Sequence, residues 1–219
     1  MGERFKIHNP EDTPPPKKTF IIHPSRPKTF IIKEQSEAAR TASDSEWFKQ
    51  QNTNDCGPCL LLNSINALGI ENAPRSVEEM RAEVNAIRRA ANARELAPTD
   101  WFTTDDLNRF FLSRGFSVTG YSGDPGDREA QDSVVRSVNT NLEKSFDLIY
   151  TTFPGSHYRG VIPKADQEDY ELLDSFSNAP QTITKMQVEA LVSETLNAPK
   201  RRTGQLEAIG IVRRMQRGE

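Results

Sequence analysis

The stretch of sequence that decides the fold is Gln50-Gln51-Asn52-Thr53-Asn54-Asp55-Cys56-Gly57-Pro58-Cys59-Leu60-Leu61-Leu62, where a polar loop passes into an apolar helical pattern. Asp55 is a suitable N-cap for this helix, and Pro58 fits the first turn, where its missing N–H removes no hydrogen bond. Leucine and isoleucine residues then repeat at helical spacing. Cys56 is therefore predicted to lie at a helix N-terminus, where the positive end of the helix dipole favours thiolate over thiol. A cysteine so placed is a candidate nucleophile.

A glutamine amide precedes this cysteine. Gln50 lies six residues before Cys56, so its side chain can point at the oxygen that becomes negative when a thiolate attacks a carbonyl. With the backbone N–H of Cys56 it would form a two-donor oxyanion hole, in which each donor is worth roughly 3 kcal/mol. Gln50 is the predicted donor, and its neighbour Gln51 is the reserve candidate.

Length and composition indicate one main domain with segments outside its core. A chain of 219 residues is long enough for one full core plus tails. An apolar content of 35% and a mean hydropathy of -0.66 are low for a domain that is packed throughout. The net charge of -3 and the pI near 5.8 give no indication of nucleic acid or of a membrane as a partner.

The sequence offers no targeting or membrane segment. Met1-Gly2-Glu3-Arg4 opens no secretory signal, and no apolar run approaches the length of a membrane span. Two cysteines do not make a disulfide scaffold, so a reducing, cytoplasmic setting is expected. The residues imply no metal ion and no organic cofactor.

Residues 1–45 differ from the rest of the chain and form a proline-rich leader. Within it the sequence Lys-Thr-Phe-Ile-Ile occurs twice, at 18–22 and at 28–32. Each copy is predicted to be a short strand. The pair would form an edge hairpin or a flexible leader, and the alternative is an arm that binds substrate or inhibits the site.

The main domain, residues 46–196, begins with helices and ends with strands. Apolar residues recur at helical intervals after Cys56, after a capping box that starts at Ser76, and after Thr103 or Thr104. Helices followed by an antiparallel meander predict an α+β domain. The basic tail, residues 197–219, could add an edge strand at 209–212. The other predicted strands are 116–121, 147–153, 158–162 and 170–176, and further helices are expected around 134–142 and after Thr184.

Only one histidine lies outside the leader, and it can serve the cysteine. His157 stands at the start of one predicted strand, and Asp174 stands 17 residues on, at the end of the next. The midpoint between them falls in Lys164-Ala165-Asp166-Gln167, where the turn is expected. Residues equidistant from a hairpin turn face each other on one face of the sheet. Asp174 is therefore predicted to orient the imidazole of His157, which would act as the base for Cys56.

These residues resemble the site of the papain-like cysteine peptidases, and most closely that of the bacteriocin-processing (double-glycine leader) peptidases, with their Gln…Asp-Cys-Gly signature. The match runs from about Trp47 to Phe176 and keeps the order Cys, His, Asp. The resemblance implies a papain-like α+β fold, with the cysteine on the central helix of an N-terminal helical half and the other two residues on a C-terminal antiparallel sheet. It also implies a cysteine peptidase that hydrolyses a peptide or isopeptide bond. The implied site residues are Cys56, His157, Asp174 and Gln50.

The expected substrate is a polypeptide other than the chain itself, because no double glycine occurs in the sequence. Ubiquitin-like proteins are among the candidate substrates. Trp47, Trp101 and Tyr158 are candidate walls of a substrate groove, and burial in the core is the alternative role of each.

Other kinds of site remain open. Cys56-Gly57-Pro58-Cys59 is also the four-residue active site of thioredoxins, so a thiol–disulfide oxidoreductase is an alternative, although thioredoxins place a hydrophobic strand and a tryptophan before the motif. Zinc bound by Cys56, Cys59 and His157 would lack an evident fourth ligand. A silent binding module, a deamidase and an acyltransferase on the same fold are further alternatives.

Overall fold

The computed structural model describes residues 47–122, 128–142, 146–153, 157–164, 169–197 and 208–215, and the predicted leader 1–45 lies outside them. The described part of the chain contains five helices and six strands, and helices predominate in its first half, as predicted for an α+β domain. The elements in chain order are α1 (Cys56–Leu68), α2 (Val77–Ala90), α3 (Thr104–Ser113), β1 (Phe116–Ser122), α4 (Arg128–Leu142), β2 (Leu148–Phe153), β3 (His157–Pro163), β4 (Asp169–Asp174), β5 (Gln181–Thr184), α5 (Lys185–Asn197) and β6 (Ala208–Arg214).

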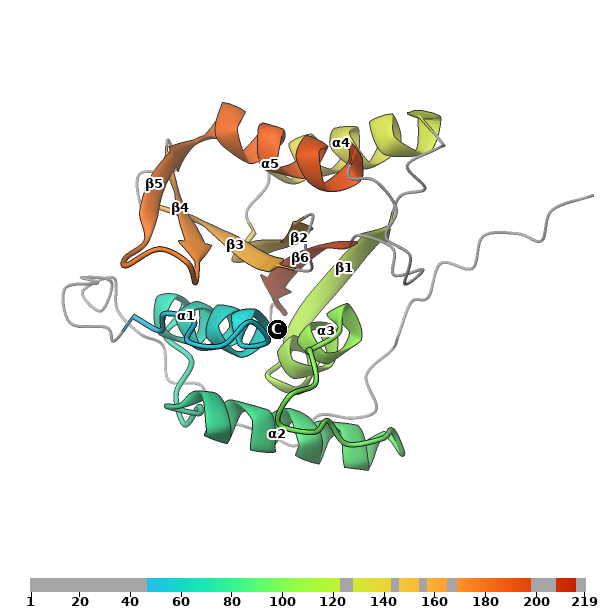
Figure 1. Cartoon of the computed structure of the whole chain (residues 1–219). Coiled ribbons are helices and arrows are strands. Elements are labelled where there is room, and N and C mark those ends of the chain that lie inside the picture. Colours follow the sequence, from blue (N-terminus) through green and yellow to red (C-terminus); the bar gives the residue numbers. More distant parts are fainter. Residues whose placement is uncertain are drawn as a thin grey trace, which may run out of the picture.

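The sheet lies between two layers of helices. Its strand order is β1-β6-β2-β3-β4-β5, and every neighbouring pair is antiparallel. Helices α1, α2 and α3 lie on one side of the sheet, with α1 against β3, and α4 and α5 lie on the other (Figure 1). Each side has its own buried apolar cluster. No helix among the described residues is both long and apolar enough to span a bilayer.

Three helices begin where the sequence predicted, and a side chain caps each of these starts. The hydroxyl of Ser76 accepts a hydrogen bond from the N–H of Glu79 at the start of α2. At α3, Thr103 is the N-cap and forms a full capping box with Asp106. Thr184 caps α5 by accepting from the N–H of Gln187. These starts are fixed locally, which is why the sequence alone predicts them.

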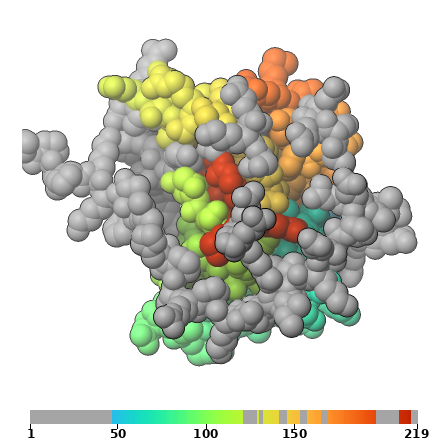
Figure 2. Space-filling view, turned by 180° about the vertical axis from the view of Figure 1, so that it is seen from behind, coloured from blue at the N-terminus to red at the C-terminus, as the bar shows by residue number. Residues whose placement is uncertain are grey.

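The strand predicted at 209–212 exists, but the prediction that it lies at an edge of the sheet is wrong. It is β6, it lies between β1 and β2, and its red atoms border the light green atoms of β1 in the view from behind (Figure 2). Ile209 and Ile211 are buried against the α4 and α5 layer, and Val212 is buried against the α1 layer. A strand covered on both faces needs apolar side chains on both, and the run Ile209-Gly210-Ile211-Val212 supplies them.

We predict that Gly210→Ala destabilises the domain strongly. Gly210 is paired with Tyr150 of β2, and a Cβ added there would lie 2.0 Å from the Tyr150 ring. The ring is fully buried, so we expect a loss of about 1–3 kcal/mol in the free energy of unfolding, measured by urea denaturation. Gly120, the partner of Gly210 on β1, is the matched control because nothing lies within 4 Å of a Cβ built there. Equal effects of the two substitutions would contradict the prediction.

Candidate active site

Cys56 is the first residue of α1 and is buried, with 1% of its surface exposed. The prediction that Asp55 caps this helix through its side chain is wrong. Asp55 makes no side-chain capping bond, because its carboxylate turns back to accept from the backbone and side-chain amides of Asn52 and pairs with Arg81 at 3.1 Å. This buried network holds the loop that leads into Cys56.

The environment of the Cys56 sulfur does not favour the thiolate that its position at a helix N-terminus predicted. Burial raises the pKa of the Cys56 thiol, and the nearby charge of Asp55 adds to the rise. Hydrogen bonds from the backbone N–H groups of Tyr158, Gly57 and Cys56 itself act in the opposite direction but do not reverse it. The resting residue is therefore a thiol, and its proton must be removed by a base before it can attack.

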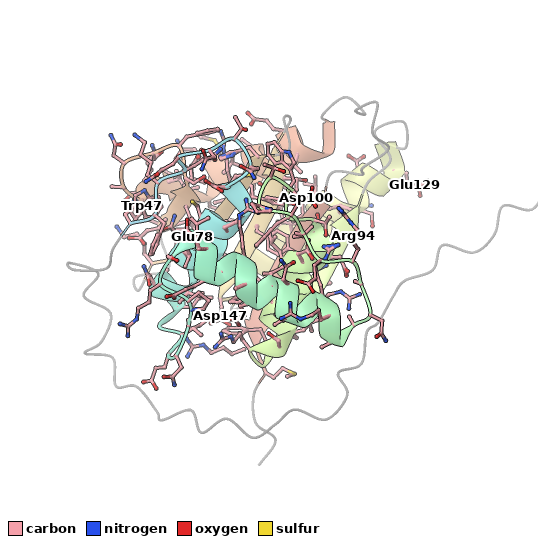
Figure 3. All side chains as sticks on the ribbon, turned by 60° about the horizontal axis from the view of Figure 1, so that its bottom comes forward. Trp47, Glu78, Arg94, Asp100, Glu129 and Asp147 are labelled. Atoms are coloured by element: carbon pink, nitrogen blue, oxygen red, sulfur yellow. The ribbon has the colours of Figure 1, made fainter. Side chains whose placement is uncertain are left out.

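The start of α1 packs closely against the loop before α3 and against β3. A Cβ on Gly57 would lie 2.7 Å from the Cβ of Phe102, so the close approach requires glycine. The hydroxyl of Tyr158, on β3, donates to the carbonyl of Phe102 at 3.0 Å. The loop is braced further by the ion pair of Arg94 with Asp100, both labelled in Figure 3, at 2.8 Å. These contacts hold the sulfur of Cys56 beside the backbone of Tyr158, the residue that follows His157.

The imidazole of His157 is hydrogen-bonded to the carboxylate of Asp174, as the sequence predicted, with Nε2 and Oδ1 2.8 Å apart. His157 is the first residue of β3 and Asp174 the last of β4. The predicted register was wrong by two residues, since Arg159 and not His157 lies directly opposite Asp174. His157 reaches the carboxylate diagonally from the same face of the sheet, a distance that long side chains span.

Three groups contact the carboxylate of Asp174, namely the ring of His157, the backbone N–H of Phe176 and the guanidinium of Arg159. Its Oδ1 also accepts from the backbone N–H of Phe176 at 3.0 Å, and its Oδ2 lies 2.8 Å from Nε of Arg159. Burial by itself would raise the pKa of Asp174, but the hydrogen bonds from His157 and Phe176 and the charges of His157 and Arg159 outweigh it, so the pKa lies below its usual value. Asp174 is thus ionised at neutral pH and can only accept, so Nε2 of His157 is the donor in their hydrogen bond.

We expect Asp174→Asn to change the acid stability of the domain. A lowered native pKa means that ionised Asp174 stabilises the folded state at any pH above the unfolded value of about 3.9, and that this contribution is lost as the pH falls through the native pKa. The substitution should therefore cost about 1–3 kcal/mol of unfolding free energy at pH 7. The difference from the wild type should shrink below pH ~4. Urea denaturation at pH 7 and pH 3.5 tests this, and a difference that stays constant across the range would contradict it.

The ring of His157 is covered by Phe176, an aromatic residue that the sequence did not single out. The two rings are stacked with centroids 4.1 Å apart and an angle of 20° between their planes. Phe176 is itself 61% exposed. It shields the hydrogen bond between His157 and Asp174 on one side while presenting its outer face to the surroundings.

Gln50 is tied to the residue after Asp174. Its backbone N–H donates to the carbonyl of Ser175 at 3.0 Å, and its Oε1 accepts from the hydroxyl of Ser175 at 3.1 Å. This contact directs the other end of the amide, the Nε2 donor, away from Ser175. Gln51 is exposed, whereas Gln50 is half-buried. The structure thus distinguishes the two glutamines that the sequence left as first and reserve candidates.

The segment around Gln50 and the turn after β4 are joined by two further hydrogen bonds. Trp47 Nε1 donates to the carbonyl of Ser177 at 2.9 Å, and Lys49 Nζ donates to Asn178 Oδ1 at 2.7 Å. We call residues 47–50 and 175–178 together the strap. It connects the segment that leads to Cys56 with the strand that carries Asp174.

The three candidate groove residues have different surroundings. Tyr158 is buried in the core, which was the alternative to a role in the groove. Trp47 is half-buried in the strap. Trp101 is 43% exposed beside Phe102. Sequence reasoning also missed Arg159 and Ser175; Arg159 could have been found, since a residue two positions after His157 on a strand shares its face.

Cys59 is fully buried one turn into α1, and burial raises the pKa of its thiol to about 12. Neither cysteine forms a disulfide. The segment from Trp47 to Asp55 contains no strand, unlike the segment before a thioredoxin motif. Within the described ranges there is no group of three or more His, Cys, Asp and Glu side chains that could hold a metal ion.

Comparisons with known proteins find similarity at the level of structure. No family model matches the sequence, and no curated protein matches it. The structure is similar to that of a double-glycine motif protease from an AMS/PCAT transporter, solved in complex with its leader peptide, with a TM-score of 0.43, 10% identity and coverage of 79% of this chain and 94% of that one. It is also similar to the Pseudomonas avirulence protein AvrPphB, with a TM-score of 0.35, 12% identity and coverage of 78% and 98%.

Proposed function

We propose that the chain is a cysteine peptidase that hydrolyses a peptide or isopeptide bond in a polypeptide. In this proposal Cys56 is the nucleophile, His157 is the general base and acid, and Asp174 orients His157. Gln50 and the backbone N–H of Cys56 bind the oxyanion. The observation that carries the proposal is the 2.8 Å hydrogen bond from His157 to ionised Asp174. The next residue along β3, Tyr158, donates its backbone N–H to the sulfur of Cys56.

The first half of the reaction forms a thioester. Nδ1 of His157 takes the proton of the Cys56 thiol as the sulfur attacks the carbonyl carbon, so the base supplies the thiolate that burial disfavours at rest. The imidazolium that forms is stabilised by Asp174 through Nε2. The carbonyl oxygen becomes an oxyanion, to which Gln50 Nε2 and the N–H of Cys56 donate. When the intermediate collapses, His157 gives its proton to the leaving nitrogen and an amine departs.

The second half regenerates the enzyme. Water replaces the departed amine, His157 removes a proton from it, and the resulting hydroxide equivalent attacks the thioester carbonyl. The same two donors bind the second oxyanion. Collapse breaks the carbon–sulfur bond, releases a carboxylic acid, and returns the proton to the sulfur of Cys56. Each step uses side chains of this chain alone.

Covalent activity probes test the proposal. The protein is treated with a panel of electrophilic peptides and ubiquitin-like proteins that trap nucleophilic cysteines, and the modified residue is identified by mass spectrometry. We expect modification of Cys56 by at least one probe, none in Cys56→Ala, and much slower modification in His157→Ala. Cys59→Ala is the matched control and should react normally.

Two results would contradict the proposal. One is modification that is independent of His157 or occurs equally at Cys59. The other is reduction of insulin disulfides that needs both cysteines and tolerates the loss of His157, which is the behaviour of an oxidoreductase.

A further inference from the structure

We propose that Arg159 is a positioning residue of this site, whose charge holds the second oxygen of Asp174 so that the first stays directed at His157. The inference rests on the proposed function, in which Asp174 orients the imidazole. It adds a fifth side chain to the predicted Cys56, His157, Asp174 and Gln50.

The geometry places Arg159 where it can act on Asp174. It lies directly opposite Asp174 in the register of β3 and β4, on the face that His157 shares. Its Nε is 2.8 Å from Oδ2, whereas His157 Nε2 and the N–H of Phe176 both contact Oδ1. The two oxygens of the carboxylate therefore have different partners, and rotation of the carboxylate would exchange them.

Charge carries this contact. The Nε–H of Arg159 does not meet hydrogen-bond geometry with the carboxylate, although the atoms are at ion-pair distance. Both side chains are largely withdrawn from solvent, with 21% and 10% of their surfaces exposed. An ion pair at such a site is screened little, so it restrains the carboxylate more than a surface pair would.

The consequence for the reaction is a matter of orientation. A carboxylate with one oxygen unrestrained would turn and lengthen the hydrogen bond to His157, and the ring would lose its fixed tautomer and direction. A misplacement of about 1 Å at a reacting group can lower the rate by about 10²-fold. Because Arg159 contacts Asp174 and Asp174 contacts the ring of His157, the role proposed for Arg159 is orientation and not substrate binding, so substrate affinity should not change. Arg159 is thus expected to affect kcat and not KM.

Two variants separate charge from structure. Arg159→Lys keeps the positive charge, and Arg159→Gln removes it while keeping a polar chain of similar length. We expect Gln to lower kcat about 10- to 100-fold with KM unchanged, and Lys to retain most of the activity. Arg109→Gln is the matched control, because Arg109 forms an exposed ion pair with Asp105 on α3, and it should behave as the wild type.

A spectroscopic measurement tests Arg159 independently of hydrolysis. In a Cys56→Ala background, the Nε2–H of His157 should give a slowly exchanging proton resonance, retained in Arg159→Lys and Arg109→Gln and lost to exchange in Arg159→Gln. Retention of that resonance in Arg159→Gln, or equal losses in the Lys and Gln variants, would overturn the proposal for Arg159 and leave the peptidase proposal intact. A wild type without hydrolytic activity would instead refute the peptidase proposal, while the resonance would still report on Arg159.

Discussion

Cys56→Ala is expected to reduce hydrolysis by about 10⁴-fold or more, the largest effect that the structure predicts. The substitution removes the sulfur that forms the thioester in the proposed reaction. Because Cys56 is buried at the start of α1, the loss of its sulfur should also cost on the order of 1 kcal/mol of stability. The measurement is kcat/KM on a peptide that labels the wild type, together with urea denaturation of both proteins.

Cys59→Ala provides the matched control for that measurement. Cys59 lies on the same helix, is as deeply buried, and loses the same atoms on substitution. The two variants should therefore have similar stability, and only Cys56→Ala should lose activity. Similar losses of activity in both would show that packing of α1, and not the nucleophile, accounts for the effect.

Gln50→Ala is expected to lower kcat by about 10²- to 10³-fold, because one of the two oxyanion donors is removed. Gln50 also accepts a hydrogen bond from Ser175 in the strap, so the alanine variant should lose about 0.5–1.5 kcal/mol of stability as well. Gln50→Glu separates these two roles. Glutamate keeps an oxygen for the hydroxyl of Ser175 but places a negative charge where the oxyanion forms.

We therefore expect Gln50→Glu to be at least as inactive as Gln50→Ala while unfolding near the wild-type midpoint. Gln51→Ala is the control, because Gln51 is exposed, and it should change neither quantity. Normal kcat in Gln50→Glu would exclude the amide as an oxyanion donor. It would leave Gln50 with a structural role in the strap.

The sequence predicted the features that depend on neighbouring residues. The order of the helices and of the strands other than β5, the caps at Ser76 and Thr184, and the meeting of His157 with Asp174 all follow from patterns within short stretches of chain. The short strand β5 (Gln181–Thr184) was not predicted. Helix capping depends on residues three or four positions apart. The pairing of two strands joined by a short connection also depends mainly on residues close in sequence. The α+β arrangement of Cys56 on a helix and His157 and Asp174 on the sheet is therefore predictable from the sequence.

What the sequence could not predict depends on residues that meet only after folding. Asp55 is a good capping residue, but Arg81, 26 positions away, draws its carboxylate elsewhere. The position of Cys56 at a helix N-terminus favours a thiolate, but burial, which involves α3 and the sheet, raises its pKa. The register of β3 and β4 differs from the symmetric prediction by two residues. That shift puts Arg159 opposite Asp174. The spacing shows that Arg159 shares a face with His157, but it does not show that Arg159 is the direct partner of Asp174.

The interior location of β6 has a consequence for biosynthesis. β1 is hydrogen-bonded in the sheet to β6 alone among the described strands, and β6 is what links it to β2. Residues 208–214 are translated after all the other strands, so until they emerge from the ribosome the sheet consists of two unconnected parts with exposed edges. A nascent chain cannot complete the sheet that carries His157 before this last strand is synthesised. The proteolytic activity proposed for this chain should accordingly be absent until residues 208–214 have emerged from the ribosome.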